Sequence, residues 1–162
     1  MIIRHAADAD LPAIIEIYNA AILTRMSTAQ LEPVTVESRS DWLSKHPPDE
    51  YPFWVADNDG CVVGWLSVKE FLPRCAYRGT AEVSVYVHTD SRNRGIGRQL
   101  LQHAIEHCGA IGLTALAGLI FDQNTASLRM FERAGFQRWG LLPGVARIDD
   151  QTRDLVIVGR AI

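Results

Sequence analysis

The sequence predicts a mixed α/β domain, in which helices flank a central mixed β-sheet. In several short runs apolar residues alternate with polar ones, as in strands; between these runs they recur every three or four residues, as in amphipathic helices. The predicted order is β-α-α-β-β-β-α-β-α-β-β, and no linker, repeat or low-complexity stretch interrupts it. We therefore expect residues 1–162 to form one domain.

Capping and breaking residues delimit the predicted helices. Asp8 or Asp10 caps the first helix, and Thr35 caps a second one that Pro47-Pro48 ends. Gly135 ends the last helix as a C′ glycine. The apolar face of the first helix consists of Leu11, Ile14, Ile15, Tyr18 and Ile22. The later helices span residues 99–108 and 124–134, and the strands span 2–4, 53–56, 61–68, 80–88, 113–120, 136–142 and 153–160.

Composition limits the partners and the compartment. A formal net charge of −3 gives no general attraction to nucleic acid or to acidic membranes, so we expect neither as a partner. The three cysteines have no metal-type spacing, and the chain shows no signal peptide or long apolar run, which predicts a reducing cytoplasm. Cys61 and Cys108 are expected in the core, whereas Cys75 lies in a loop that can border an active site. A catalytic thiol is the alternative interpretation.

The segment from Arg92 to Arg98 predicts an anion site. It is a glycine-bearing loop between a strand and a helix, and a helix start offers free backbone N–H groups and a positive dipole end. Gly95 and Gly97 let the backbone approach a phosphate closely. The loop is neither a P-loop, because Arg98 follows the second glycine, nor a dinucleotide fingerprint, because residue 100 is Leu. The loop therefore suits a pyrophosphate of another kind.

The strand before this loop carries the candidate base, Glu82. Its period of two places the valines on one face and polar or amphipathic side chains on the other. A carboxylate in a cleft can remove the proton of an amine, and partial burial would raise its pKa toward a useful value. A solvated carboxylate at a sheet edge is the alternative. The two faces are Val83, Val85 and Val87 against Glu82, Ser84, Tyr86 and His88.

One metal motif is rejected. His103, Glu106 and His107 match the metal-binding motif H-x-x-E-H, but the apolar stripe of their helix is expected to face the core instead. We therefore expect these three side chains on the solvated side, and no metal in the protein.

The loop resembles the Arg/Gln-x-x-Gly-x-Gly/Ala signature of the GCN5-related N-acetyltransferases, which bind acetyl-CoA. The strand Glu82-x-Ser84-Val85-Tyr86-Val87 is similar to that of the phosphinothricin and methionine sulfoximine acetyltransferase branch. Further similar segments are Ile17-Tyr18-Asn19, Glu32-Pro33-Val34-Thr35 and Trp139-Gly140-Leu141-Leu142-Pro143-Gly144. The resemblance implies the fold of that superfamily, in which the fourth and fifth strands splay apart around the pantetheine arm. It also implies a homodimer.

The resemblance assigns roles residue by residue. Glu82 would be the general base for direct acetyl transfer. The main chain of Val85, Tyr86 and Val87 would pair with the pantetheine amides. Asn124 would meet the pantetheine arm, and Ser127 would touch the arm or the phosphates. The pyrophosphate would lie on the backbone of Arg92, Asn93, Arg94, Gly95, Ile96 and Gly97, and the outer phosphates on Arg92, Arg94, Arg98 or Arg133. The substrate end would comprise Arg74, Cys75, Ala76, Tyr77, Arg78 and Thr28, with Arg74 or Arg78 pairing with an α-carboxylate.

One position departs from the family pattern. Many of these enzymes have a Tyr seven residues after the Asn, and the phosphinothricin enzymes tend to have His, but here the residue is Phe131, which has no proton to donate. We expect acetylation of phosphinothricin, methionine sulfoximine or methionine sulfone. The alternatives are another small amine such as a polyamine or an aminoglycoside, protein N-terminal acetylation, and a non-catalytic acyl-CoA sensor.

Overall fold

A computed structural model describes all 162 residues and confirms a mixed α/β fold around one seven-stranded sheet. The strand order is β1-β2-β3-β4-β5-β7-β6; β4 and β5 are parallel, and all other neighbours are antiparallel. The strands are β1 (Ile2–His5), β2 (Phe53–Asn58), β3 (Cys61–Glu70), β4 (Thr80–Val87), β5 (Ala115–Phe121), β6 (Gln137–Ile148) and β7 (Gln151–Ala161).

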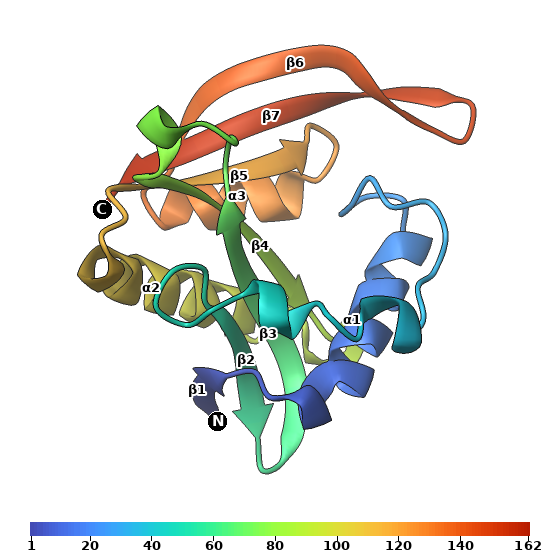
Figure 1. The fold of residues 1–162 in the computed structure, drawn as a ribbon. Coiled ribbons are helices and arrows are strands. Elements are labelled where there is room, and N and C mark those ends of the chain that lie inside the picture. Colours follow the sequence, from blue (N-terminus) through green and yellow to red (C-terminus); the bar gives the residue numbers. More distant parts are fainter.

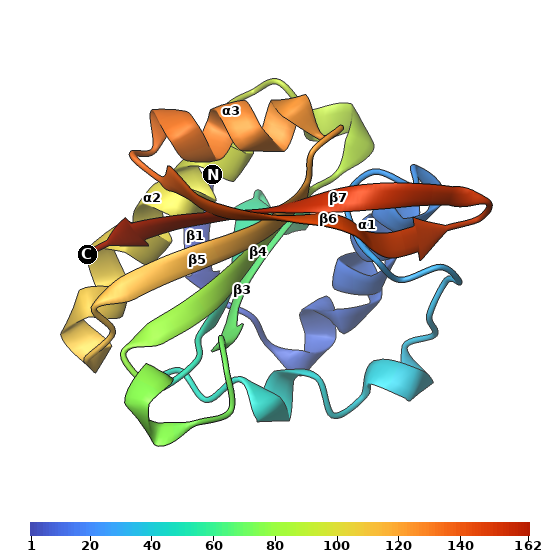
Figure 2. The same cartoon turned by 90° about the horizontal axis from the view of Figure 1, so that it is seen from above.

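Helices cover both faces of the sheet. The helices α2 (Ile96–Cys108) and α3 (Thr125–Arg133) lie on one face, and α1 (Leu11–Leu23) lies on the other with the segment that follows it (Figures 1 and 2). The larger core packs α2 and α3 against the sheet, and a smaller aromatic core packs α1 against β2 and β3. The long β6–β7 hairpin projects beyond the rest of the sheet (Figure 1).

Strand alternation decides which side chains reach each face. On β4, Val83 belongs to the α2 core and Val85 packs against it, whereas Tyr86 packs against the α1 core. The predicted division of this strand is therefore confirmed. It leaves Glu82 and Ser84 on the same face as α1, where they line a cavity.

The sheet opens between β4 and β5. Only Thr80, Ala81 and Glu82 of β4 pair with β5, at Ala115, Leu116 and Ala117. Beyond Glu82 the two strands separate, and β5 continues instead along β7. This is the splay between the fourth and fifth strands that the resemblance implies, and it leaves one edge of β4 without a strand partner.

The predicted second helix is wrong. The segment forms only two short 3-10 turns, Glu37–Arg39 and Leu43–Lys45. Thr35 does accept a hydrogen bond from Ser38 N, at 3.1 Å, as a capping residue would. The Ser38 hydroxyl, however, donates to the Thr35 carbonyl, and such local bonds from serine compete with continued helix.

Several smaller expectations need correction. Cys61 is exposed, because it lies at the β2–β3 turn beyond the reach of the helices, whereas Cys108 is buried as predicted. Burial raises the pKa of the Cys108 thiol to about 12, which agrees with an inert core residue. Asp10 stands at the start of α1 without capping it, since its carboxylate accepts two hydrogen bonds from Arg4 instead. His103 is half-buried against Trp54, with ring centroids 4.9 Å apart, rather than solvated.

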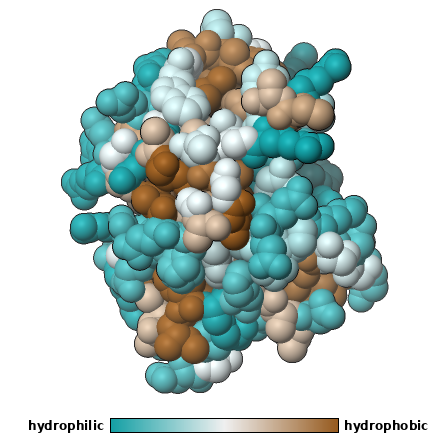
Figure 3. Space-filling model, turned by 60° about the vertical axis from the view of Figure 1, so that its left-hand side comes forward, coloured by the Kyte–Doolittle hydropathy of each residue, from teal (hydrophilic) through white to brown (hydrophobic).

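On the face shown in Figure 3, apolar residues form separate brown areas among polar teal ones. None of the helices has the length and apolar character needed to span a bilayer.

Candidate active site

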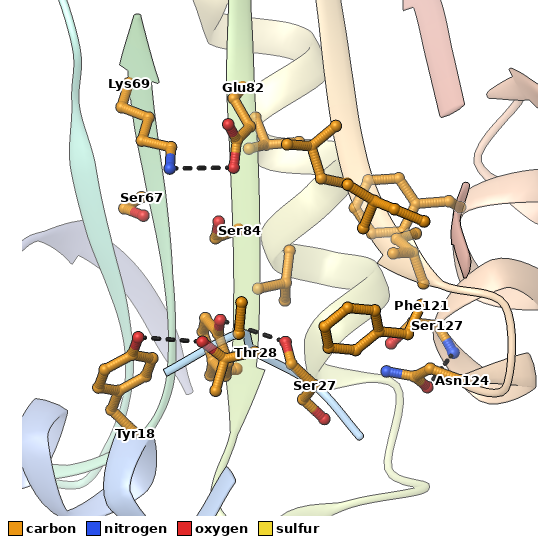
Figure 4. A pocket seen from close by; sticks show the side chains of 18 of the residues that line it. Tyr18, Ser27, Thr28, Ser67, Lys69, Glu82, Ser84, Phe121, Asn124 and Ser127 are labelled. Carbon is orange, nitrogen blue, oxygen red and sulfur yellow. Dashed lines mark hydrogen bonds and ion pairs between the residues drawn. The ribbon is translucent and has the colours of Figure 1, made fainter. Parts of the chain in front are cut away.

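A cavity of 490 Å³ lies on the α1 face of the sheet, and we call it the acceptor cavity. Its floor is a row of polar side chains on β3 and β4, with Ser67 opposite Ser84 and Lys69 opposite Glu82 (Figure 4). Aromatic and aliphatic side chains form much of the remaining wall. These include Tyr18, Trp42, Trp65, Phe121, Phe131, Val145 and Leu155.

Glu82 is buried at one end of this floor, with 9% of its surface exposed. Its carboxylate has one charged partner, because Lys69 Nζ lies 3.1 Å from Oε1. The two side chains come from paired positions on neighbouring strands, so the sheet itself fixes their approach. A buried carboxylate facing a cavity is a site for a proton acceptor or for a cationic ligand.

A second cavity, of 640 Å³, lies at the start of α2, and we call it the phosphate-loop cavity. The backbone N–H groups from Asn93 to Arg98 donate to no carbonyl of the protein, since the first helical bond at this end is Gln99 N to Gly95 O, at 3.0 Å. Gly95 has a φ of +78°, which turns the chain into the helix. Four arginines, Arg92, Arg98, Arg129 and Arg133, line this cavity.

Backbone groups of β4 that pair with no neighbouring strand connect the two cavities. His88 N donates to Val63 O, so the alternation of an antiparallel pair directs the backbone of Tyr86 toward β3 and that of Val85 and Val87 away from it. The latter two therefore face the gap where β5 has separated. An extended chain of amides fits this edge as an added strand would.

The cavities meet at this gap. Five residues line both of them, namely Ser27, Val85, Tyr86, Asn124 and Ser127. A ligand with its phosphates at the start of α2 and an arm along β4 would thus reach the acceptor cavity near Glu82. The unpaired N–H groups and the free strand edge fit a nucleotide thioester of the CoA type.

Asn124 and Phe131 shape the β5 side of the gap. The Asn124 side chain caps α3 by accepting from Ser127 N at 3.1 Å, so it holds the start of that helix against the cavities. Phe131 is 3% exposed and meets Phe136 edge-on, with centroids 4.9 Å apart. The position at which the resemblance implies a Tyr or a His is therefore occupied by a packed apolar ring.

The segment after α1 closes the far end of the acceptor cavity. The Tyr18 and Thr28 hydroxyls are 3.1 Å apart (Figure 4). The Tyr86 hydroxyl donates to Ser27 O, at 3.4 Å. Burial raises the pKa of Tyr86, so its hydroxyl stays protonated. These contacts hold residues 27–29 over the cavity, and they place the predicted Thr28 in its wall.

The other predicted substrate residues lie elsewhere. Arg74, Cys75, Ala76, Tyr77 and Arg78 are all exposed around a 3-10 turn, and none of them lines either cavity. Among the predicted cofactor residues, the structure brings all to the phosphate-loop cavity except Arg94, which is exposed beside it.

Sequence reasoning missed several residues of the site. Lys69 lies one residue past the predicted end of its strand, and only the register of β3 against β4 shows that it meets Glu82. Arg129 precedes Arg133 by one turn of α3, and this spacing was a usable signal. Val145 and Ala146 enter the acceptor cavity because β6 runs on to Ile148, past the predicted end at residue 142.

The comparison with known proteins agrees with this geometry. Residues 14–136 match the model of the acetyltransferase (GNAT) family. The chain belongs to this family. It is therefore an N-acetyltransferase, and GNAT enzymes use acetyl-CoA as the acetyl donor.

Individual relatives match this GNAT chain over nearly its whole length. YwnH of Bacillus subtilis, provisionally named a phosphinothricin acetyltransferase, is 44% identical over 163 residues, covering 100% of this chain and 99% of its own. The L-methionine sulfoximine/L-methionine sulfone acetyltransferase of Pseudomonas aeruginosa is 38% identical, covering 96% and 91%. A solved phosphinothricin acetyltransferase from Sinorhizobium meliloti in complex with acetyl-CoA superposes with a TM-score of 0.93 at 28% identity, covering 99% and 88%.

Proposed function

We propose that this enzyme acetylates the amino group of a small amino-acid analogue, of the phosphinothricin or methionine sulfoximine and sulfone type, with Glu82 as general base. The observation that carries the proposal is the burial of the Glu82 carboxylate in a cavity that joins the phosphate-loop cavity at the β4–β5 gap. The names of relatives at 44% and 38% identity support the substrate class.

The mechanism follows from the position of Glu82. When bound, acetyl-CoA supplies a thioester whose C–S bond breaks as the amine nitrogen forms a C–N bond. Glu82 accepts the proton that the nitrogen loses, directly or through water, and its burial keeps bulk water from competing for this role. The backbone of Val85 and Val87 would hold the arm of the donor, and the backbone of residues 92–97 would hold its pyrophosphate.

The thiolate leaves without help from residue 131. Phe131 is a packed ring with no acidic proton, so a general acid of the Tyr type is absent from this position. A thiolate is stable enough to depart unprotonated near neutral pH. Direct transfer from thioester to amine is therefore consistent with the residues present.

Two finer assignments complete the proposal. We propose that Arg74 and Arg78 bind the substrate, with their exposed loop moved toward the acceptor cavity. We also infer a homodimer. Exposed apolar side chains on the edge strand β6 support it, since such strands are normally covered: Trp139, Leu141, Leu142 and Val145.

The experiment that tests the proposal is thiol release from acetyl-CoA by the purified protein. The panel contains methionine sulfoximine, phosphinothricin, methionine sulfone, ordinary amino acids, a polyamine, an aminoglycoside and an alanine-initiated peptide. Turnover confined to the amino-acid analogues is expected. Turnover of the polyamine, the aminoglycoside or the peptide alone would overturn the substrate class, and binding of acetyl-CoA without turnover of any acceptor would favour the sensor.

A further inference from the structure

The acceptor cavity contains an ion pair whose two charges are complementary to those of an α-amino acid in sign and spacing. We propose that Lys69 binds the α-carboxylate of the acceptor and so determines its specificity, while Glu82 faces the neighbouring amine. This inference rests on the proposed function and adds to it a residue that recognises the substrate. Its basis is the position of Lys69, the geometry of the pair and the polar floor around it.

The position of Lys69 leaves its ammonium group available to a ligand in the acceptor cavity. Its ammonium lies 3.1 Å from Glu82 Oε1, and its side chain is 55% exposed, whereas that of Glu82 is 11% exposed. The exposed ammonium of Lys69 is screened by solvent, so it is held less tightly than it would be in a fully buried ion pair. It can exchange that partner for a ligand at small cost, because its side chain already reaches the cavity wall (Figure 4).

The acceptor cavity offers no other cation of this kind. Lys69 is the one lysine or arginine among its lining residues. His46 also lines it, but burial lowers the pKa of His46, and its Nδ1–H donates to Trp42 O at 2.8 Å. Arg74 and Arg78 line neither cavity. An anionic group that enters this cavity therefore meets Lys69.

The pair is complementary to the charges of an α-amino acid. In such an acceptor two carbon atoms separate the amine nitrogen from the carboxylate oxygens, so its two charges are about as close as those of Lys69 and Glu82. On binding, one protein ion pair is exchanged for two, with the amine at Glu82 and the carboxylate at Lys69. A simple amine would gain only the first of these contacts.

The neighbouring serines extend the same polar floor. Ser67 is only 6% exposed, yet its side chain lines the cavity, as does that of Ser84 on the paired strand. Figure 4 draws no interaction for either hydroxyl with the side chains around it. Both hydroxyls are thus available to the carboxylate or to the polar side-chain group of the acceptor.

The test compares two acceptors that differ only in the α-carboxylate. L-methionine sulfone and its α-carboxamide are assayed with the wild type, Lys69→Met and Lys69→Arg. For Lys69→Met we expect the ratio of kcat/KM for the sulfone to kcat/KM for the carboxamide to fall about 10- to 100-fold, because only the acid loses a contact, whereas any effect on Glu82 is common to both acceptors. Lys69→Arg, which keeps the charge, should restore part of the preference for the acid.

Other results overturn the assignment in distinguishable ways. If Lys69→Met lowers kcat equally for both acceptors, Lys69 only positions Glu82. If neither acceptor is affected, the carboxylate is bound elsewhere. A wild type that acetylates neither compound overturns the proposed function itself. A cooperative thermal transition and an unchanged KM for acetyl-CoA verify that each variant is folded.

Discussion

Phe131 of α3 lies so close to the backbone of Gly118 on β5 that no side chain fits between them. A Cβ placed on Gly118 would come within 2.8 Å of Phe131 Cε1 and 3.1 Å of Val158 Cγ2. The ring therefore packs directly against the strand that borders the β4–β5 gap, and this contact fixes α3 beside the cavities.

The variant Gly118→Ala should accordingly be destabilised. Overpacking of this kind typically costs about 1–3 kcal/mol, which chemical denaturation would measure. Gly109→Ala is the matched control, because a Cβ there meets nothing within 4 Å and its φ of −62° suits alanine. Equal stability of the two variants would contradict the close packing of Phe131.

Glu82→Gln should lose turnover while keeping the fold. Removal of a general base typically lowers kcat about 10²- to 10⁴-fold, and the amide keeps the shape of the side chain. Acetyl-CoA affinity, measured by calorimetry, should stay within about twofold, because Glu82 does not line the phosphate-loop cavity. Glu70→Gln, one residue past Lys69 and exposed, is the control that should retain full activity. Full turnover by Glu82→Gln would place the base elsewhere.

Arg98→Ala should weaken acetyl-CoA binding. The side chain lines the phosphate-loop cavity at the first turn of α2, and the loss of one charged contact should raise KM for acetyl-CoA about three- to tenfold. High salt should reduce the difference in KM for acetyl-CoA between Arg98→Ala and the wild type, since salt screens exposed charges. Arg138→Ala removes the same charge from an exposed position on β6 and should leave KM unchanged. A matching effect at Arg138 would indicate a general charge effect.

Asp10 should make stability depend on pH in the acid range. Hydrogen bonds from Arg4 hold the pKa of this carboxyl below its ordinary value of 3.8. A lowered pKa in the folded state stabilises the protein above the unfolded value, and this contribution is lost as the pH falls through the folded value. Asp10→Asn should therefore cost about 1–3 kcal/mol at pH 7.

Denaturation of wild type and Asp10→Asn as a function of pH would measure this contribution. The difference between the two should narrow only below about pH 4. Asp8→Asn is the control, since Asp8 is exposed and outside the Arg4 contacts. A difference between wild type and Asp10→Asn that persists unchanged in acid would contradict the assignment.

The proposed dimer gives a mass prediction. Light scattering should give twice the 18.0 kDa of one chain for the wild type. Leu142→Glu, on the exposed edge strand β6, should shift the mass toward that of one chain. Ile2→Glu is the control, because Ile2 is 62% exposed on β1, at the opposite edge of the sheet from β6. A wild type with the mass of one chain would overturn the dimer.

Local patterns correctly predicted those elements in which apolar residues repeat at the spacing of a single buried face. The division of β4 into a valine face and a polar face could be read from residues 80–88, and α2 from its apolar stripe. The same reasoning failed for residues 35–46, because helix and 3-10 turns share the same capping signals and differ only in packing and local competition. It also failed for Cys61, whose exposure depends on where the helices end.

The sequence by itself determined the glycine-rich start of α2 and the polar face around Glu82, because both depend on residues adjacent in the chain. Only the tertiary structure decided that Lys69 meets Glu82, that residues 74–78 lie away from both cavities, and that the two cavities meet at the β4–β5 gap. These relationships depend on strand register and on where two strands separate. Such contacts join residues distant in the chain, and no local pattern encodes them.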